Sequence, residues 1–171
     1  LGVANREIMP IFCCSGKRDI GTKRLMEFII NVAPGPTTPT TAPKFVSIEG
    51  EELVADETQP AVAFIFKSQI EQHIGEITYF RVVRGKITEG MELVNSRTGN
   101  KEKLSQLFAV AGKNRIKVTE LAAGDIGCTV KLKGTRTNDT LAAAGAHVKV
   151  EPIVFPEPRY RAAVKAKEQG D

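Results

Sequence analysis

Lysine and arginine are concentrated in one stretch of this sequence, residues 81–117. The stretch holds nine basic and three acidic side chains, a net charge of +6, whereas residues 44–80 carry −5 and the whole chain carries +4. Basic side chains on the loops of a rigid scaffold bind nucleic-acid phosphates in a salt-sensitive, sequence-independent way. Such charge asymmetry indicates a polyanionic partner, and the alternative is a solvated lysine-rich face.

The basic residues that we expect to contact phosphates occur at intervals along predicted hairpins and do not form continuous runs within strands. Aromatic residues make up only 6% of the chain, so stacking of single-stranded bases is not expected. The charge pattern selects Arg97, Lys101, Lys103, Lys113 and Arg115.

A second candidate site is the loop that begins with Ser15, Gly16 and Lys17. It follows a short apolar run at residues 8–14, and ligands of α/β sheets bind beyond the carboxyl ends of such buried strands. A backbone N–H in this loop is placed to donate to a ligand. The alternative is an ordinary strand-to-helix turn.

Catalysis by this chain itself is not expected. The phosphate-binding pattern Gly-x-x-x-x-Gly-Lys-Ser/Thr and the Asn-Lys-x-Asp motif are both absent from the sequence. Cys13 and Cys14 are adjacent and point opposite ways along a strand, so they predict neither a disulfide nor a metal site with Cys128. We therefore rank a hydrolase or metalloenzyme last and expect no metal and no bound cofactor.

The elements around these sites fall into four parts. The apolar run and a helix at 22–33 form a strand–loop–helix unit of an α/β sheet within residues 1–33. Residues 34–43 hold four Pro and four Thr, which predicts a stiff linker. Residues 44–151 are expected to form an antiparallel β-barrel. A proline hinge and a strand at 160–164 occupy residues 152–171.

Short strands separated by Gly-containing turns predict the barrel. We expect a short helical turn at 116–121 and strands at 61–66, 77–83, 91–94, 101–108 and 128–132. The predicted fold is therefore mainly β, preceded by a strand–loop–helix remnant of an α/β domain.

Composition excludes several classes of protein. The chain has 171 residues, of which 42% are hydrophobic, as in globular proteins. No apolar run reaches the roughly 18 residues of a membrane helix, and no signal peptide opens the chain, so we expect a cytoplasmic protein without a membrane partner. It begins at Leu1 rather than Met, and we expect a piece of a larger protein.

The ordered set of motifs resembles the translational GTPase family, most closely elongation factor G. The matching segments are residues 9–16, 33–36, 63–64, 80–85, 120–127, 137–141 and 155–158. The resemblance implies the end of a GTPase domain, a translation-factor-type β-barrel and the start of a third domain. It also implies that the barrel docks on small-subunit ribosomal RNA and relays the motion of its own GTPase domain during elongation.

In this family the loop of Ser15, Gly16 and Lys17 corresponds to the last guanine-binding motif, so the intact parent is expected to bind GTP or GDP with Mg²⁺. A ribosome-protection paralogue and a stand-alone RNA-binding β-barrel are the alternatives. Residues 8–33 expose apolar side chains when their sheet is incomplete, and we expect them to pack on the barrel or on a second copy.

Overall fold

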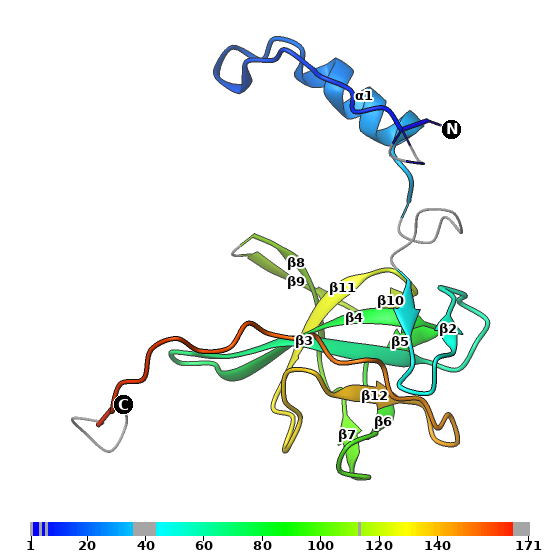
Figure 1. The fold of residues 1–171 in the computed structure, drawn as a ribbon, viewed down its shortest axis with the longest axis vertical. Coiled ribbons are helices and arrows are strands. Elements are labelled where there is room, and N and C mark those ends of the chain that lie inside the picture. Colours follow the sequence, from blue (N-terminus) through cyan, green and yellow to red (C-terminus); the bar gives the residue numbers. More distant parts are fainter. Residues whose placement is uncertain (1, 4, 6, 36–43, 113, 166–171) are drawn as a thin grey trace.

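Antiparallel strands form most of the regular structure between residues 44 and 150 (Figure 1). The computed structural model describes residues 2–165 except 4, 6, 36–43 and 113. Within them, the main sheet has eight strands in the order β7-β6-β12-β3-β4-β11-β8-β9. These strands are β3 (Val62–Glu71), β4 (Gly75–Arg84), β6 (Glu92–Asn95), β7 (Lys101–Lys103), β8 (Leu107–Ala111), β9 (Asn114–Val118), β11 (Ile126–Val130) and β12 (Thr140–Ala142).

Two short ribbons complete the β structure of the described residues. One pairs β1 (Phe45–Val46) with β2 (Glu52–Leu53), and the other pairs β5 (Lys86–Thr88) with β10 (Glu120–Ala122). Both ribbons are antiparallel, so the mainly β antiparallel fold expected from the sequence is confirmed.

One hydrophobic core joins strands from both ends of the main sheet. Leu93 of β6 and Leu107 of β8 lie far apart in the strand order, yet both are fully buried in the same cluster. Phe80 of the central β4 and Leu121 of the β5–β10 ribbon pack into that cluster as well. A sheet whose two ends share one core must curl around it, as in a small barrel.

A second cluster covers the opposite face of the central strands. Ala63 and Ile65 of β3 face the first core, whereas Val62 and Phe64 face the second cluster. This division follows from the period of two in a β-strand. Leu53 of β2 belongs to the second cluster, so the β1–β2 ribbon closes this face.

The N-terminal segment forms the only α-helix among the described residues. After the 3-10 turn η1 (Gly16–Arg18), α1 (Thr22–Val32) confirms the expected helix. The ring centroids of Phe12 and Phe28 lie 4.7 Å apart, so the extended segment before the loop packs on α1. No residue of α1 is buried, and Figure 1 shows α1 apart from the sheet, so the expected packing of residues 8–33 on the barrel is wrong. Packing on a second copy stays a prediction.

Four predicted elements are not formed as expected. The strand predicted at 101–108 is divided between β7 and β8, with residues 104–106 outside both. Residues 8–14 pair with no strand of the described chain and are extended without a ladder. Residues 116–121 lie in β9 and β10 rather than in a helical turn, because β8 and β5 supply them with antiparallel partners. Residues 160–164 are extended and exposed without strand pairing in the part of the chain that the structure describes.

Two further expectations have different outcomes. Most of the predicted linker, residues 36–43, lies outside the described residues. Among the helices that the structure describes, none has the length and apolar character to span a membrane.

Candidate nucleic-acid interface

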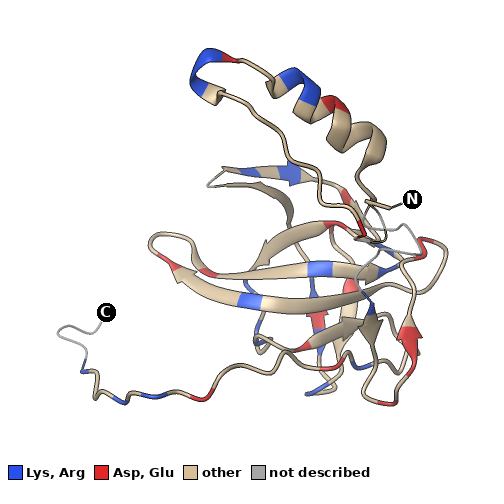
Figure 2. Ribbon diagram, turned by 45° about the horizontal axis from the view of Figure 1, so that its top comes forward, with Lys and Arg blue, Asp and Glu red and all other residues tan. Residues whose placement is uncertain are grey.

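The structure separates the basic residues selected from the sequence. Lys101 and Lys103 lie on β7 at one edge of the main sheet, whereas Arg115 lies on β9 at the opposite edge. Lys113 lies outside the described residues. Figure 2 shows that basic residues occur on the β8–β9 hairpin as well as on the main body of the sheet. Arg115 therefore lies apart from Lys101 and Lys103, and RNA contact by the predicted residues stays a prediction.

Arg97 belongs to an ion pair with a buried carboxylate. Its Nε donates to Oδ1 of Asp139 at 2.6 Å, and its Nη2 donates to Oδ2 at 2.9 Å and to the carbonyl of Gly134 at 2.8 Å. The Asp139 side chain is only 4% exposed. Because the guanidinium is committed to a buried carboxylate, its primary role is to hold this loop.

Arg115 is committed in the same way at the other edge. Its Nη1 lies 2.9 Å from both carboxylate oxygens of Glu71. This hydrogen bonding raises the pKa of Arg115 and lowers that of Glu71. The pair ties the β8–β9 hairpin to the β3–β4 hairpin, and both residues line a cleft of about 600 Å³.

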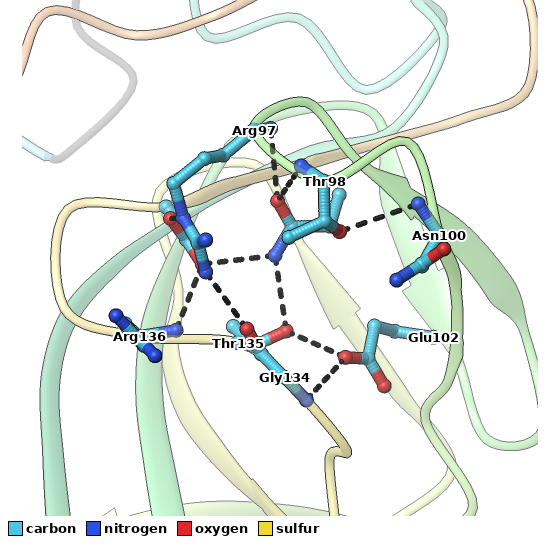
Figure 3. A network of polar contacts seen from close by, with 9 residues as sticks. Arg97, Thr98, Asn100, Glu102, Gly134, Thr135 and Arg136 are labelled. Carbon is cyan, nitrogen blue, oxygen red and sulfur yellow. Dashed lines mark hydrogen bonds and ion pairs between the residues drawn. The ribbon is translucent and has the colours of Figure 1, made fainter.

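A buried glutamate fixes the loop between β11 and β12, residues 131–139. The side chain of Glu102 accepts hydrogen bonds from the amides of Lys133 and Gly134 and from the hydroxyl of Thr135, each at 3.0 Å. Figure 3 shows Glu102 directed at Gly134 and Thr135. Because Glu102 lies on β7, these bonds hold the loop against the edge strand that carries Lys101 and Lys103.

Asp139 and Asn95 complete the anchor. Besides Arg97, Asp139 accepts hydrogen bonds from the Asn95 amide group at 2.9 Å and from the backbone N–H of Arg136 at 2.8 Å. Burial raises the pKa of Asp139, but its hydrogen bonds to Arg97, Asn95 and Arg136 outweigh burial and leave that pKa below its ordinary value. The carboxylate therefore stays charged and keeps the loop in place.

Three cations on the anchored loop are exposed, and the loop is bonded to β7, which carries two more. The buried side chains of Leu132 and Thr135 alternate with exposed Lys131, Lys133 and Arg136. In Figure 3 the Arg136 guanidinium points away from the polar network. We call the exposed cations of β7 and of this loop together the basic surface, and its members are Lys101, Lys103, Lys131, Lys133 and Arg136.

The basic surface keeps its charge free of internal partners. In the described part of the chain, none of its five side chains forms an ion pair. Glu92 lies opposite Lys103 in the β6–β7 pairing, and it is exposed. Glu102 and Asp139 are buried and turned into the network. An arrangement of free cations on a fixed loop and edge strand suits the binding of several phosphates.

The charge count missed Lys131, Lys133 and Arg136 because they follow the basic stretch. A signal was present, since these cations flank a buried leucine and a Gly-Thr turn. The loop joins β11 to β12 and contacts β7, but this position follows from the order of strands in the sheet, which the local sequence does not show.

The second predicted site is a tight turn. The backbones of Ser15 and Ile20 form an antiparallel bridge with hydrogen bonds of 2.9 and 3.1 Å, and Gly16 and Lys17 belong to η1. A Cβ at Gly16 would meet no atom within 4 Å, so the position is open. Guanine binding by Ser15, Gly16 and Lys17 stays a prediction. Among the described residues, no cluster of three His, Cys, Asp or Glu side chains is placed to hold a metal ion.

Comparisons with known proteins agree with this fold. The family model of elongation factor G domain 2 matches residues 60–144. A crystal structure of a protein from Thermus thermophilus aligns over 85% of this chain with a TM-score of 0.63 and 25% sequence identity, and this chain spans 20% of that protein. Residues 60–144, which include the whole basic surface, therefore form an elongation factor G domain 2 module within this chain.

Proposed function

We propose that this chain is part of a ribosomal translocation factor resembling elongation factor G. Its domain 2 module binds the phosphate backbone of small-subunit ribosomal RNA through the basic surface. The observation that carries the proposal is that β7 and the β11–β12 loop bonded to it carry five exposed cations, none of which forms an ion pair among the described residues.

The anchored loop makes this binding efficient. Glu102 and Asp139 hold the loop backbone before any RNA arrives, so less conformational entropy is lost on binding. Lys and Arg bind phosphates without reading bases, and release of counterions makes the affinity fall with salt. We therefore expect sequence-independent, salt-sensitive binding to a folded RNA surface.

The proposed factor also has a GTPase domain. In that parent, Ser15, Gly16 and Lys17 contribute to the guanine site, GTP or GDP binds with Mg²⁺, and the barrel relays the motion of the GTPase domain. The chain itself holds no phosphate-binding loop and is not proposed to hydrolyse GTP. The same basic surface would serve a ribosome-protection paralogue or a stand-alone RNA-binding barrel.

Charge reversal tests the proposed surface. The double substitution Lys133→Glu with Arg136→Glu is expected to weaken binding to isolated small ribosomal subunits by at least about 10-fold. It should also reduce the slope of log affinity against log salt by about 2, because two phosphate contacts are lost. Binding is measured by co-sedimentation of the 171-residue chain at several salt concentrations.

The matched control reverses two exposed lysines outside the surface, Lys149→Glu and Lys165→Glu, so the net charge changes equally. This control should bind within about twofold of the wild type. Equal losses in both double variants would show that only the overall charge matters. That result would contradict a localised RNA-binding surface.

A further inference from the structure

A cleft of about 600 Å³ lies between the β3–β4 hairpin and the β8–β9 hairpin. Figures 1 and 2 both show the two hairpins projecting from the same side of the barrel, and the ion pair of Glu71 with Arg115 joins them. Strands β3, β4, β8, β9 and β11 all contribute side chains to the lining of the cleft. Pockets that bind small organic ligands typically have volumes of about 300–1,000 Å³, so this cleft is large enough for one.

Part of the cleft lining is apolar and rests on the core. Tyr79 and Val110 line the cleft and pack on a buried cluster that contains Ile77 and Cys128. Ile126 lines the cleft as well and is 49% exposed, so apolar surface faces solvent here. Because packed residues hold this surface from beneath, an apolar ligand that covers it gains the hydrophobic effect without a rearrangement of the strands.

Two cations line the cleft and keep donors that no other described residue uses. Lys67 forms no ion pair in the described part of the chain, and its Nζ lies 5.6 Å from the centroid of the Tyr79 ring. Arg115 contacts Glu71 through Nη1 alone, so its Nε and Nη2 make no hydrogen bond to a described residue. These two nitrogens form one edge of the planar guanidinium, and such an edge binds both oxygens of a carboxylate at once.

The charge of the lining favours a ligand with a single negative charge. Its charged residues are Lys67, Arg115 and Glu71, two cations and one carboxylate, which gives a net charge of +1. Glu71 stays ionised because the hydrogen bond from Arg115, above all, lowers its pKa. The net charge attracts one anionic group, whereas the Glu71 carboxylate repels the second charge of a phosphate dianion.

We propose that the cleft binds a small aromatic carboxylate. The aromatic body covers the apolar lining, where Phe66 and Tyr79 offer rings to pack against, and the carboxylate accepts hydrogen bonds from Nε and Nη2 of Arg115. Lys67 attracts the same charge. The inference goes beyond the proposed function and does not depend on it, because no member of the basic surface lines the cleft.

Titration of the 171-residue chain with naphthoate tests the site, with backbone amide chemical shifts as the readout. Saturable shifts are expected at the amides of Tyr79, Val110 and Gly112, and their position distinguishes the cleft from the apolar side chains of residues 8–33. The neutral analogue naphthamide has nearly the same shape and should bind at least about fivefold more weakly. Equal affinities for the two ligands, or no saturable shift at the cleft, would overturn the proposal.

Naphthyl phosphate tests the choice of anion. The Glu71 carboxylate should make it bind more weakly than naphthoate at a pH where the phosphate is a dianion. Tighter binding of naphthyl phosphate at the same amides would identify a phosphate site and overturn the carboxylate assignment.

Lys67→Gln is the informative variant, because it removes one cation and leaves the pair of Glu71 with Arg115 in place. It should weaken naphthoate binding about threefold and leave naphthamide binding unchanged. The matched control is Lys149→Gln, which changes an exposed lysine outside the cleft lining and should leave both affinities unchanged. Equal losses of naphthoate affinity in the two variants would show attraction to the overall charge alone and overturn the site.

Val110→Thr tests the apolar contact. This substitution nearly keeps the side-chain volume but places a hydroxyl in the lining, so it should weaken naphthoate and naphthamide alike by about threefold. Unchanged affinities for both ligands would contradict an aromatic body lying on the apolar lining.

Discussion

Asp139→Ala removes the centre of the polar network behind the basic surface. Four hydrogen bonds converge on this carboxylate, two from Arg97 and one each from Asn95 and the Arg136 backbone, at 2.6–2.9 Å. Truncation leaves the buried Asn95 amide without this acceptor and the guanidinium of Arg97 without its counterion. Arg97 is 39% exposed and recovers part of its solvation, so the buried amide contributes much of the cost.

Removing one partner of a buried ion pair costs about 3–5 kcal/mol. With a urea m-value of about 1.5 kcal/mol/M for a small domain, a loss of about 3 kcal/mol lowers the midpoint by about 2 M. That loss is a large share of the roughly 5–15 kcal/mol by which domains are stable. We therefore expect Asp139→Ala to be mostly folded in buffer and to unfold early in urea.

Urea titration of the 171-residue chain measures this loss, and a double-mutant cycle with Arg97→Ala isolates the pair. The double variant should be less destabilised than the sum of the two single variants, because each single variant leaves an unpaired group. A midpoint for Asp139→Ala within about 0.3 M of the wild type would refute the reasoning, since it would mean that the network contributes nothing to folding.

Acid gives an independent check on the same carboxylate. Its pKa is lowered in the folded state, so its contribution to stability is complete above the ordinary aspartate pKa of about 4 and is lost as the pH falls through the folded value. The wild type should lose more stability than Asp139→Ala as the pH falls below about 4. Parallel pH profiles for the two proteins would contradict this assignment.

Three further substitutions test backbone geometry. Lys131 has φ 64° at the start of the anchored loop, a conformation that glycine adopts without strain. Lys131→Gly should therefore raise the free energy of unfolding by about 0.5–1 kcal/mol and, because a cation is lost, weaken RNA binding several-fold. Thermal unfolding measures the change in stability, and any loss of stability would contradict backbone strain at Lys131. A Cβ at Gly85, φ 74°, would lie 2.6 Å from the Ala61 backbone, so Gly85→Ala should cost about 3 kcal/mol or more in urea unfolding. Gly90→Ala, at φ 83° in open space, should cost only about 1 kcal/mol, and equal costs would show that the contact with Ala61 is relieved without penalty.

Periodicity predicts most strands of the fold but not the ends of the barrel. The alternation in β3 and β4 reflects burial between two clusters, and local residues carry that signal directly. The helical turn expected at 116–121 is not formed, and the apolar residues of this segment do not alternate strictly. In the structure, Ile116 and Val118 are alternate residues of β9, which pairs with β8, and β10 begins after Thr119 and pairs with β5. The apolar pattern is irregular because the segment contains two strands with different partners.

The candidate site was harder to predict than the strands, because the charges in a sequence do not show which residues form ion pairs. Arg97 and Arg115 find their carboxylates 42 and 44 residues away, at Asp139 and Glu71. Neither pairing has a local signature, since it depends on which hairpins the fold brings together. Lys101 and Lys103, which the charge pattern selected, are exposed on β7, and their contact with RNA stays a prediction.

Some of the opposite charges of residues 44–80 and 81–117 meet in the folded chain. Glu51, Glu57 and Glu71 of the acidic stretch pair with Arg84, Lys86 and Arg115 of the basic stretch, at 2.9–3.9 Å. The charge asymmetry that first indicated a polyanion is therefore partly internal, and it serves the packing of the strands. On the anchored loop, Lys131, Lys133 and Arg136 have no ion pair, because the carboxylates of Glu102 and Asp139 are buried and bonded to backbone amides and Arg97. Whether a cation is free to bind RNA thus depends on whether the fold gives it an internal carboxylate partner, which the local charge of the sequence does not show.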